Sequence, residues 1–174
     1  MGHYITKNHG LTIRNARADE LGKVSLLLRD AYRQYENFIR PDAWKQYLED
    51  IMDVRSRLSE SELIVAELDH RLAGSVTLYL DGSRSFPEAW PRGWAVVRLL
   101  AVHPEYRGQG IGRALMEECI LRCRQAKVTA IGLHTTEVMD TARRMYEKMG
   151  FVRFTESDFH PAPGVTVMAY RLKL

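Results

Sequence analysis

The feature that most constrains this chain is an apolar run that leads into a glycine-rich segment and then into an amphipathic pattern. Residues 95–102 are apolar except at Arg98, which is typical of a strand buried on both faces in the middle of a sheet. From Ile111 onwards, apolar residues recur every four positions with charged residues opposite, which predicts a helix covering such a sheet. The sequence therefore indicates an α/β fold in which residues 107–112, Arg-Gly-Gln-Gly-Ile-Gly, connect a central strand to a helix.

The glycine-rich segment predicts an anion site. Unsatisfied backbone N–H groups and the positive end of the helix dipole meet at the start of a helix, and glycine lets the backbone approach a phosphate closely. A dinucleotide-binding loop is excluded because it needs Gly-x-Gly-x-x-Gly, whereas Gly108, Gly110 and Gly112 alternate and are followed by Arg113. A nucleotide-hydrolysing loop is excluded as well, because no lysine lies in the segment.

Periodicity predicts the other elements of the fold. Strands are expected at residues 12–16, 63–68, 72–80, 95–102, 130–135, 152–154 and 165–172. Helices are expected from an N-cap at Asp19, from Pro41 at the first helical position, from Ile111, and over the apolar positions up to Gly150. The segment 81–93 has no period and is expected to be a long surface loop. Strand, helix and strand alternate in the second half, so we expect a mixed α/β sheet in a single domain over residues 1–174.

Composition and charge exclude several classes of protein. A chain of 174 residues with 45% hydrophobic and 27% charged residues is typical of a globular domain, and no apolar stretch is long enough to span a bilayer. The net charge of +3 is small and the basic residues are dispersed, so neither nucleic acid nor a membrane is expected as a partner. Residues 1–10 lack the apolar segment of a secretory signal, and we expect a cytoplasmic protein.

The two cysteines, Cys119 and Cys123, are four residues apart on the predicted helix. Side chains at this spacing hold their Cβ atoms about 5–6 Å apart, whereas a disulfide needs about 3.8 Å. A metal site would need further ligands, and neither a Cys-x-x-Cys motif nor a pair of histidines lies nearby. Two buried thiols are expected, without a disulfide and without a metal.

Two motifs resemble a known family. Residues 102–112, Val-His-Pro-Glu-Tyr-Arg-Gly-Gln-Gly-Ile-Gly, resemble motif A of the GNAT superfamily of acetyl-CoA-dependent N-acetyltransferases, whose core is Arg/Gln-x-x-Gly-x-Gly/Ala. Residues 142–151, Ala-Arg-Arg-Met-Tyr-Glu-Lys-Met-Gly-Phe, are similar to that family's second signature, Ala-x-x-Leu-Tyr-x-x-x-Gly-Phe. The resemblance is clear from about residue 95 to residue 154. It implies a GNAT-like mixed sheet of about seven strands with about four flanking helices, whose central strands splay around the acyl-CoA.

The resemblance also implies roles for individual residues. The cosubstrate is acetyl-CoA, its pantetheine arm pairs with the backbone of the central strand, and its pyrophosphate lies on the glycine loop. These cofactor-binding residues are Leu100, Ala101, Val102, Arg107, Gly108, Gln109, Gly110, Ile111, Gly112 and Arg113. Tyr146 matches the tyrosine that donates a proton to the departing CoA thiolate. The alternative for Tyr146 is a core aromatic residue on a buried helix face.

Two departures from the family pattern concern the chemistry. Met139 stands where the family often has an asparagine, so any side-chain hydrogen bond to pantetheine is lost. Val96 and Val97 stand where many members carry a glutamate that acts as general base. Deprotonating an alkylamine of pKa near 10.4 at pH 7 costs about 4.6 kcal/mol, so a base matters. The sequence leaves His134, His103 and Glu137 open as candidates, and a neutral amine that needs no protein base as another possibility.

The leading hypothesis is therefore transfer of an acetyl group from acetyl-CoA to a primary amine by direct attack, with Tyr146 as the acid. No cysteine nucleophile is required. The alternative is a regulator that binds acyl-CoA without catalysis, which the missing asparagine and glutamate make conceivable. The acceptor is not specified by the sequence, and a homodimer is possible because many members of the family pair.

Overall fold

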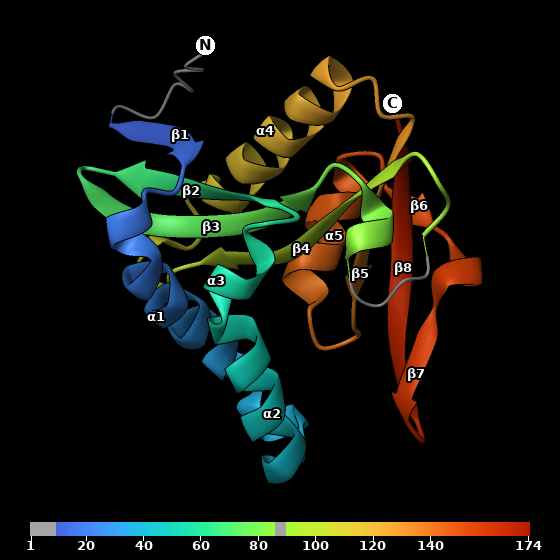
Figure 1. The fold of residues 1–174 in the computed structure, drawn as a ribbon. Coiled ribbons are helices and arrows are strands. Elements are labelled where there is room, and N and C mark those ends of the chain that lie inside the picture. Colours follow the sequence, from blue (N-terminus) through green and yellow to red (C-terminus); the bar gives the residue numbers. More distant parts are fainter. Residues whose placement is uncertain (1–9, 86–89) are drawn as a thin grey trace. The chain divides into compact units, whose positions relative to one another are not determined.

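The computed structural model describes residues 10–85 and 90–174 (Figure 1). Over these residues, eight strands form a mixed sheet accompanied by five α-helices. The chain divides into two compact units, the first made of Met1–Leu78 with Leu99–Cys119 and the second of Tyr79–Arg98 with Ile120–Leu174. Two strands, β3 (Arg71–Tyr79) and β4 (Trp94–Val102), and one helix, α4 (Ile111–Gln125), contribute residues to both units. The single domain expected over residues 1–174 stays a prediction.

In the first unit, three antiparallel strands lie side by side (Figure 1). β1 (Leu11–Asn15) pairs with β2 (Glu62–Leu68), and β2 pairs with β3 (Arg71–Tyr79). The turn between β2 and β3 consists of Asp69 and His70, whose φ angles of 48° and 64° give the left-handed pair that suits a two-residue hairpin. The predicted hairpin is confirmed.

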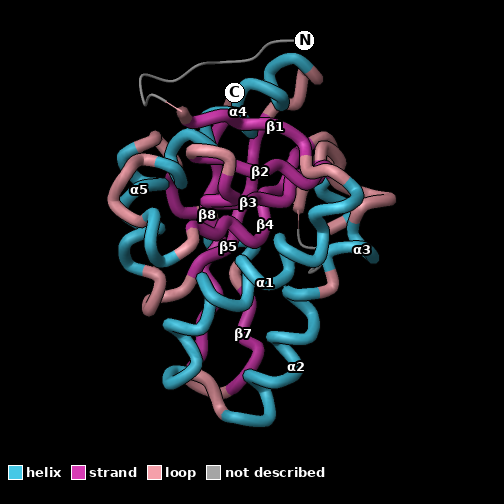
Figure 2. The backbone as a smooth tube through the Cα atoms, turned by 90° about the vertical axis from the view of Figure 1, so that its left-hand side faces the viewer, coloured by secondary structure: helices cyan, strands magenta, loops and turns pink. Residues whose placement is uncertain are grey.

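Three helices belong to the first unit, and Figure 2 shows them in cyan. They are α1 (Leu21–Tyr32), α2 (Pro41–Met52) and α3 (Val54–Arg57). α1 buries the apolar face that its periodicity predicted, including Val24 and Leu28. α2 begins at Pro41, as predicted, because proline has no N–H to lose at the first helical position. α3 lies within a charged stretch that carries no apolar period, and it was not predicted.

The predicted N-cap at Asp19 is wrong. Asp19 lies in a 3₁₀ turn, Ala18–Glu20, and α1 begins after it at Leu21. The neighbouring acid stabilises the turn instead, because the Glu20 carboxylate accepts the backbone N–H of Arg17 at 2.8 Å. The carboxylate of Asp19 or that of Glu20 could accept a free backbone N–H at the start of this helical segment, and the sequence pattern did not distinguish the two residues.

In the second unit, the first half of β4 runs parallel to β5 (Ala130–Thr135), with Trp94–Val97 paired to Ala130–Leu133. β5 is antiparallel to β8 (Val165–Lys173), which also pairs with β6 (Val152–Arg153) and β7 (Phe159–Ala162). The predicted mixed sheet is confirmed, with eight strands rather than about seven and five helices rather than about four. β7 was missed because it is short, largely exposed and contains a proline.

α5 (Asp140–Lys148) follows β5 in the second unit. The chain leaves this helix through Gly150, whose φ of 93° is the left-handed conformation that commonly ends helices. The helix therefore ends just before Gly150, as the C-cap pattern predicted.

The segment 81–93 is only partly the surface loop that was expected, and its residues 86–89 lie outside the described residues. Gly82–Arg84 form a 3₁₀ turn, and Trp90 is 8% exposed. Trp90 joins a buried cluster with Tyr79, Val96 and Ala169. The large apolar area of an indole explains this burial, since a tryptophan in an aperiodic segment still gains free energy by leaving water.

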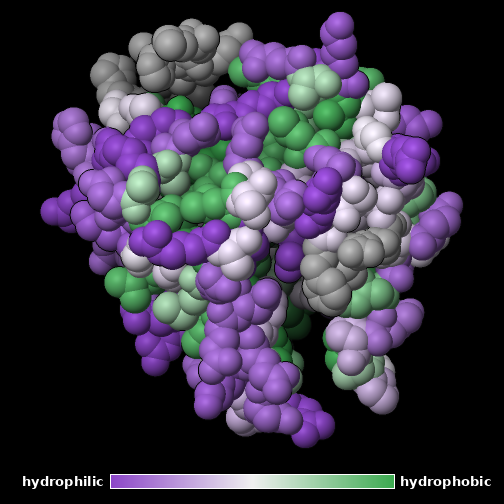
Figure 3. All heavy atoms as spheres, viewed as in Figure 1, coloured by the Kyte–Doolittle hydropathy of each residue, from purple (hydrophilic) through white to green (hydrophobic). Residues whose placement is uncertain are grey.

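Figure 3 shows hydrophobic side chains gathered over β2 and β3 and mainly hydrophilic side chains on α2. This polar character of α2 agrees with its burial pattern, in which only Trp44 and Ile51 are buried. Among the described residues, none of the helices combines the length and hydropathy needed to cross a bilayer.

Candidate functional site

The glycine loop of the first unit has the backbone conformation that an anion site requires. Gly108 and Gly110 have φ angles of 76° and 78°, in the left-handed region that other residues rarely occupy. Both glycines are exposed, and a Cβ placed on either would meet nothing within 4 Å. Steric crowding is therefore not the reason for these glycines. Their conformation, and the open space beside them, leave room for a ligand to approach the backbone.

The start of α4 carries backbone donors that lack an acceptor within the helix, beside these glycines. The Ala114 N–H donates to the Gly110 carbonyl at 3.0 Å, which is the first i to i−4 bond of the helix. The three preceding N–H groups have no acceptor within the helix. Those groups belong to Ile111, Gly112 and Arg113. Such groups, together with the helix dipole, are the donors that bind phosphates at helix starts, and pyrophosphate binding here stays a prediction.

Gly74, in the middle of β3, positions this helix and was not among the predicted site residues. A Cβ at Gly74 would lie 2.9 Å from the Ala101 carbonyl oxygen and 3.0 Å from the side chains of Ile111 and Leu115. Both of those side chains are buried, so the first turns of α4 lie directly against the sheet. A glycine inside an apolar strand run is the signal that could have identified this close approach.

The end of β4 changes direction at Leu99. Its φ of 54° is left-handed, which is strained for a leucine and occurs mostly where function requires it. Two residues earlier, at Val97, the pairing of β4 with β5 stops. Beyond Leu99 the strand is held by the first unit, because the Leu100 carbonyl accepts the Tyr32 hydroxyl at 3.3 Å. The His103 N–H donates to the Ala73 carbonyl of β3 at 2.9 Å.

Arg107, the first residue of the loop motif, holds the loop to α1. Its guanidinium donates to the Ala31 carbonyl at 3.0 Å, in the last turn of the helix, where carbonyls lack intrahelical partners. Burial raises the pKa of the nearby Tyr35 hydroxyl, and the charge of Arg107 opposes that shift. Arg107 therefore anchors the loop through its side chain. Whether it also contacts a cofactor stays a prediction.

The side chain of Arg113 faces its own helix. Its guanidinium donates to the Glu117 carboxylate at 2.8 Å, an exposed i to i+4 pair of small energetic weight. Gln109 is exposed in the loop.

Tyr146 lies in the second unit, as the buried residue of α5, with 6% exposure. Its ring packs against Phe151 at a centroid distance of 5.8 Å. Its carbonyl accepts the N–H groups of Met149 and Phe151, each at 3.0 Å, so the chain turns back around it. This environment fixes the ring firmly, which suits both a core aromatic residue and an acid that must be held in place.

His134, one of the three candidate bases, is enclosed by aromatic rings in the second unit. Its ring centroid lies 4.8 Å from that of Trp90 and 5.0 Å from that of Phe159. Nε2 lies 2.7 Å from the Ser157 carbonyl oxygen, which can only accept, so Nε2 carries a proton. Burial lowers the pKa of His134, although the Ser157 carbonyl favours the charged form. The ring is therefore neutral at pH 7, with its lone pair on Nδ1.

The other two candidate bases differ from His134. His103 lies in the first unit, where Nδ1 accepts the Glu105 N–H at 3.3 Å and caps a 3₁₀ turn. That lone pair is used by the backbone. Glu137 is exposed in the second unit. The structure thus places the predicted cofactor residues together in the first unit, and places Tyr146 and His134 in the second.

The prediction of two buried free thiols is confirmed, whereas the expectation of no metal stays a prediction. Cys119 and Cys123 form no disulfide, and both are fully buried on α4. Within residues 10–85 and 90–174, no group of three or more His, Cys, Asp or Glu side chains is arranged to hold a metal ion.

Comparison with known proteins agrees with this geometry. The profile of the Acetyltransferase (GNAT) family matches residues 26–151. A mycothiol acetyltransferase of Propionibacterium freudenreichii subsp. shermanii is 40% identical over 73 residues, which cover 41% of this chain and 23% of that protein. Human N-acetyltransferase 8B is 29% identical over 132 residues, covering 71% of this chain and 56% of that protein. The matches thus span well under two thirds of these relatives.

Solved structures show the same fold. The PaiA N-acetyltransferase of Thermoplasma acidophilum, in complex with coenzyme A, has a TM-score of 0.73 at 16% identity, covering 95% of this chain and 99% of that one. A GNAT family acetyltransferase of Brucella melitensis, in complex with acetyl-CoA, has a TM-score of 0.62 at 20% identity, covering 96% and 90%. With the family profile matching most of its length, this chain belongs to the GNAT family of acetyltransferases.

Proposed function

We propose that this protein transfers an acetyl group from acetyl-CoA to a primary amine by direct attack. The observation that supports the proposal is the start of α4, where left-handed glycines lie beside N–H groups that lack an intrahelical acceptor, an arrangement suited to an anion. A CoA pyrophosphate is the anion that this site would bind in a GNAT acetyltransferase.

Acetyl-CoA would be bound mainly by backbone groups rather than by side chains. The N–H groups from Gly108 to Arg113 would receive the pyrophosphate, and Gly74 would keep the helix start in place against β3. The edge of β4 at Leu100, Ala101 and Val102 would pair with the pantetheine amides. The left-handed turn at Leu99 supports this role, because it redirects the strand directly after its pairing with β5 stops.

The chemical half is a single displacement. The amine nitrogen attacks the thioester carbonyl, a C–N bond forms, the C–S bond breaks, and the thiolate leaves. Tyr146 would donate its phenolic proton to that thiolate, the attacking nitrogen would release one proton to solvent, and the phenolate of Tyr146 would regain a proton from solvent. His134 keeps a lone pair on Nδ1, but its enclosure between aromatic rings argues against it as the base. We therefore infer that the amine reacts as the neutral fraction present in solution.

The acceptor itself is a matter for experiment. The matched relatives include a mycothiol acetyltransferase and an N-acetylaspartate synthetase of Danio rerio, so their names do not agree on an acceptor. A panel of primary amines should include a polyamine, free amino acids, an amino sugar and lysine-containing peptides. Release of the CoA thiol would be followed for each amine, with the amine omitted as control.

Faster thiol release with at least one amine, accompanied by the acetylated product in a mass spectrum, is the expected result. A protein that binds acetyl-CoA in calorimetry yet releases thiol no faster with any amine would instead be a non-catalytic acyl-CoA-binding regulator. Absence of acetyl-CoA binding would overturn both readings.

A further inference from the structure

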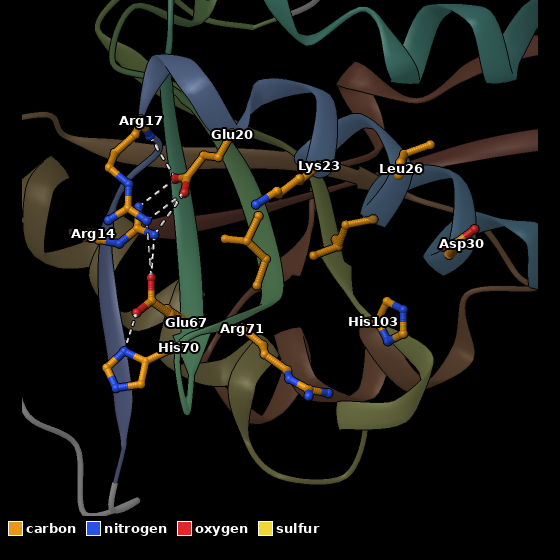
Figure 4. Close-up of a pocket in the computed structure, with 12 residues that line it drawn as sticks. Arg14, Arg17, Glu20, Lys23, Leu26, Asp30, Glu67, His70, Arg71 and His103 are labelled. Atoms are coloured by element: carbon orange, nitrogen blue, oxygen red, sulfur yellow. Dashed lines mark hydrogen bonds and ion pairs between the residues drawn. The ribbon is translucent and has the colours of Figure 1, made fainter.

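A second site lies in the first unit, in a cavity of about 370 Å³ between α1, the sheet strands and the residue that follows β4 (Figure 4). Its lining includes Arg14 of β1, Lys23 of α1, Arg71 at the start of β3, and His103. None of these residues belongs to the glycine loop. Its size is within the range of small-molecule sites, about 300–1,000 Å³.

On one side of the cavity, the carboxylates of Glu20 and Glu67 are paired with arginine side chains (Figure 4). Arg14 donates to Glu20 at 2.6 Å and to Glu67 at 2.5 Å, and Arg17 lies 3.2 Å from Glu20. The bonds from Arg14 lower the pKa of both carboxyl groups, so both are ionised at pH 7. Two arginines thus balance two carboxylates. This network contributes no net charge to the cavity.

The remaining cations of the cavity lack such partners. Within the described part of the chain, neither Lys23 nor Arg71 forms an ion pair or a side-chain hydrogen bond. Asp30, the other acid of the lining, is paired with Arg29 at 2.8 Å. The cavity therefore carries an uncompensated positive charge, supplied from α1 and from the start of β3.

His103 adds a donor to the same part of the cavity, and Figure 4 shows it on the side of Arg71, away from the Arg14 network. Because its Nδ1 accepts the Glu105 N–H, the N–H of the ring is on Nε2. Lys23, Arg71 and His103 thus present N–H donors, the groups that bind carboxylate or phosphate oxygens.

Apolar side chains complete the lining. Leu26, Leu27 and Leu72 contribute to it, and Leu26 is 46% exposed. Cations beside an apolar wall suit a ligand that joins an anionic group to an apolar body. A free inorganic anion would leave the leucines uncovered.

We propose that this cavity binds a small organic anion, carrying a carboxylate or a phosphate on an apolar body, at a site separate from that of acetyl-CoA. The proposal does not depend on acetyl transfer, since it rests on charge and lining alone. Carboxylate and phosphate share the required chemistry, and the choice of probe distinguishes them.

The test is calorimetry of the whole protein with three probes, hexanoate, hexyl phosphate and inorganic phosphate. We expect saturable binding of at least one of the two hexyl probes, stronger than that of inorganic phosphate. Arg71→Gln and Lys23→Gln should each weaken binding about ten-fold or more, because each removes a charge-assisted hydrogen bond. Lys45→Gln, a charge change on exposed α2 outside the cavity, should leave binding unchanged.

Each outcome decides the proposal. Preference for hexyl phosphate or for hexanoate identifies the anionic group, and either result supports the site. Binding of none of the probes, or binding that Arg71→Gln and Lys23→Gln do not weaken, would overturn it. Loss of binding in the presence of saturating CoA would also overturn it, by assigning the cavity to the cofactor. Both variants should keep the wild-type affinity for CoA, measured separately, so a failure of this site differs from a failure of the proposed function.

Discussion

The glycine loop of the first unit and the aromatic surroundings of His134 and Tyr146 in the second differ in what they offer a ligand. Gly108 and Gly110 are exposed, and the donors beside them are backbone N–H groups. Tyr146 is 6% exposed, and His134 packs between two aromatic rings. Backbone recognition depends on conformation, whereas the chemistry of a buried side chain depends on its neighbours. Substitutions should therefore affect affinity in the first region and turnover in the second.

The largest effect is expected for Gly110→Asp, which should reduce acetyl-CoA binding below detection in calorimetry. Aspartate would place a negative charge where the helix start attracts the pyrophosphate. Gly110→Asn is the matched control, because asparagine has a similar size and tolerates a left-handed φ without the charge. Near-normal CoA affinity in a folded Gly110→Asp protein would remove the pyrophosphate assignment, and Gly112→Asp should behave like Gly110→Asp.

Tyr146→Phe should lower kcat about 10²–10⁴-fold with little change in the KM for acetyl-CoA, because the hydroxyl is needed only when charge develops on sulfur. Steady-state kinetics with the best amine of the panel would measure both constants, and a thermal melt would show whether the variant is folded. Turnover at the wild-type rate would mean that Tyr146 is a core residue only.

Replacing a strand glycine by alanine should have a different effect on stability and CoA binding in each of the two regions. Gly74→Ala meets the Ala101 carbonyl and the first turns of α4, and should cost about 1–3 kcal/mol while weakening CoA binding. Gly132→Ala meets the Trp90 indole, and should destabilise the second unit through that ring. Gly22→Ala on the exposed face of α1 meets nothing within 4 Å and should stabilise the protein by about 0.4–1 kcal/mol. Equal effects for Gly74→Ala and Gly22→Ala would contradict the close approach of α4 to β3.

Acid should weaken the second unit through His134. Burial lowers the pKa of His134 in the native state, so the unfolded chain, with a pKa near 6.5, binds the proton more readily. The free energy of unfolding should therefore fall as pH drops below about 7 and level off below the native pKa. His134→Gln keeps a donor for the Ser157 carbonyl and should reduce this pH dependence in urea titrations.

A variant of His134 would distinguish two mechanisms, one in which His134 is the general base and one in which the amine reacts already neutral. We expect His134→Ala to leave the shape of the kcat/KM profile unchanged, with activity rising towards the pKa of the acceptor. Loss of a limb near or below pH 6.5 in that variant would identify His134 as the base.

The smallest effect concerns Met139, the N-cap of α5, which makes no side-chain cap bond. Met139→Asn should stabilise the protein by about 0.5–1 kcal/mol, because asparagine can accept an N–H of the first turn. A thermal melt without an increase in Tm would show that the local backbone, with φ −93° and ψ 43°, does not permit the cap.

Periodicity was sufficient to predict the elements whose apolar residues repeat regularly. β5 has the predicted bounds, 130–135, and α2 begins at the predicted Pro41. Short elements without a repeat, such as α3 and β7, left no such signal. Asp19 failed as an N-cap because a 3₁₀ turn precedes α1, and capping patterns do not reveal turns of that kind.

The candidate site was predictable where it depends on backbone conformation. The alternating glycines specify a loop before a helix, and both left-handed φ angles are observed. Gly74 and Trp90 were missed because their importance comes from contacts far along the chain, with α4 and with Gly132. The environment of His134 depends in the same way on Ser157 and Phe159, which no local pattern connects to it.

The buried thiols of α4 have a practical consequence. Cys119 and Cys123 are both fully buried, so a thiol reagent should label them only when α4 opens away from its packing partners. In the native protein they would add little background to an assay of released CoA. The rate of their alkylation in the absence of substrate would measure how often the helix that carries the glycine loop detaches. The factor by which bound CoA slows this alkylation would then measure how much the ligand stabilises the packing of α4.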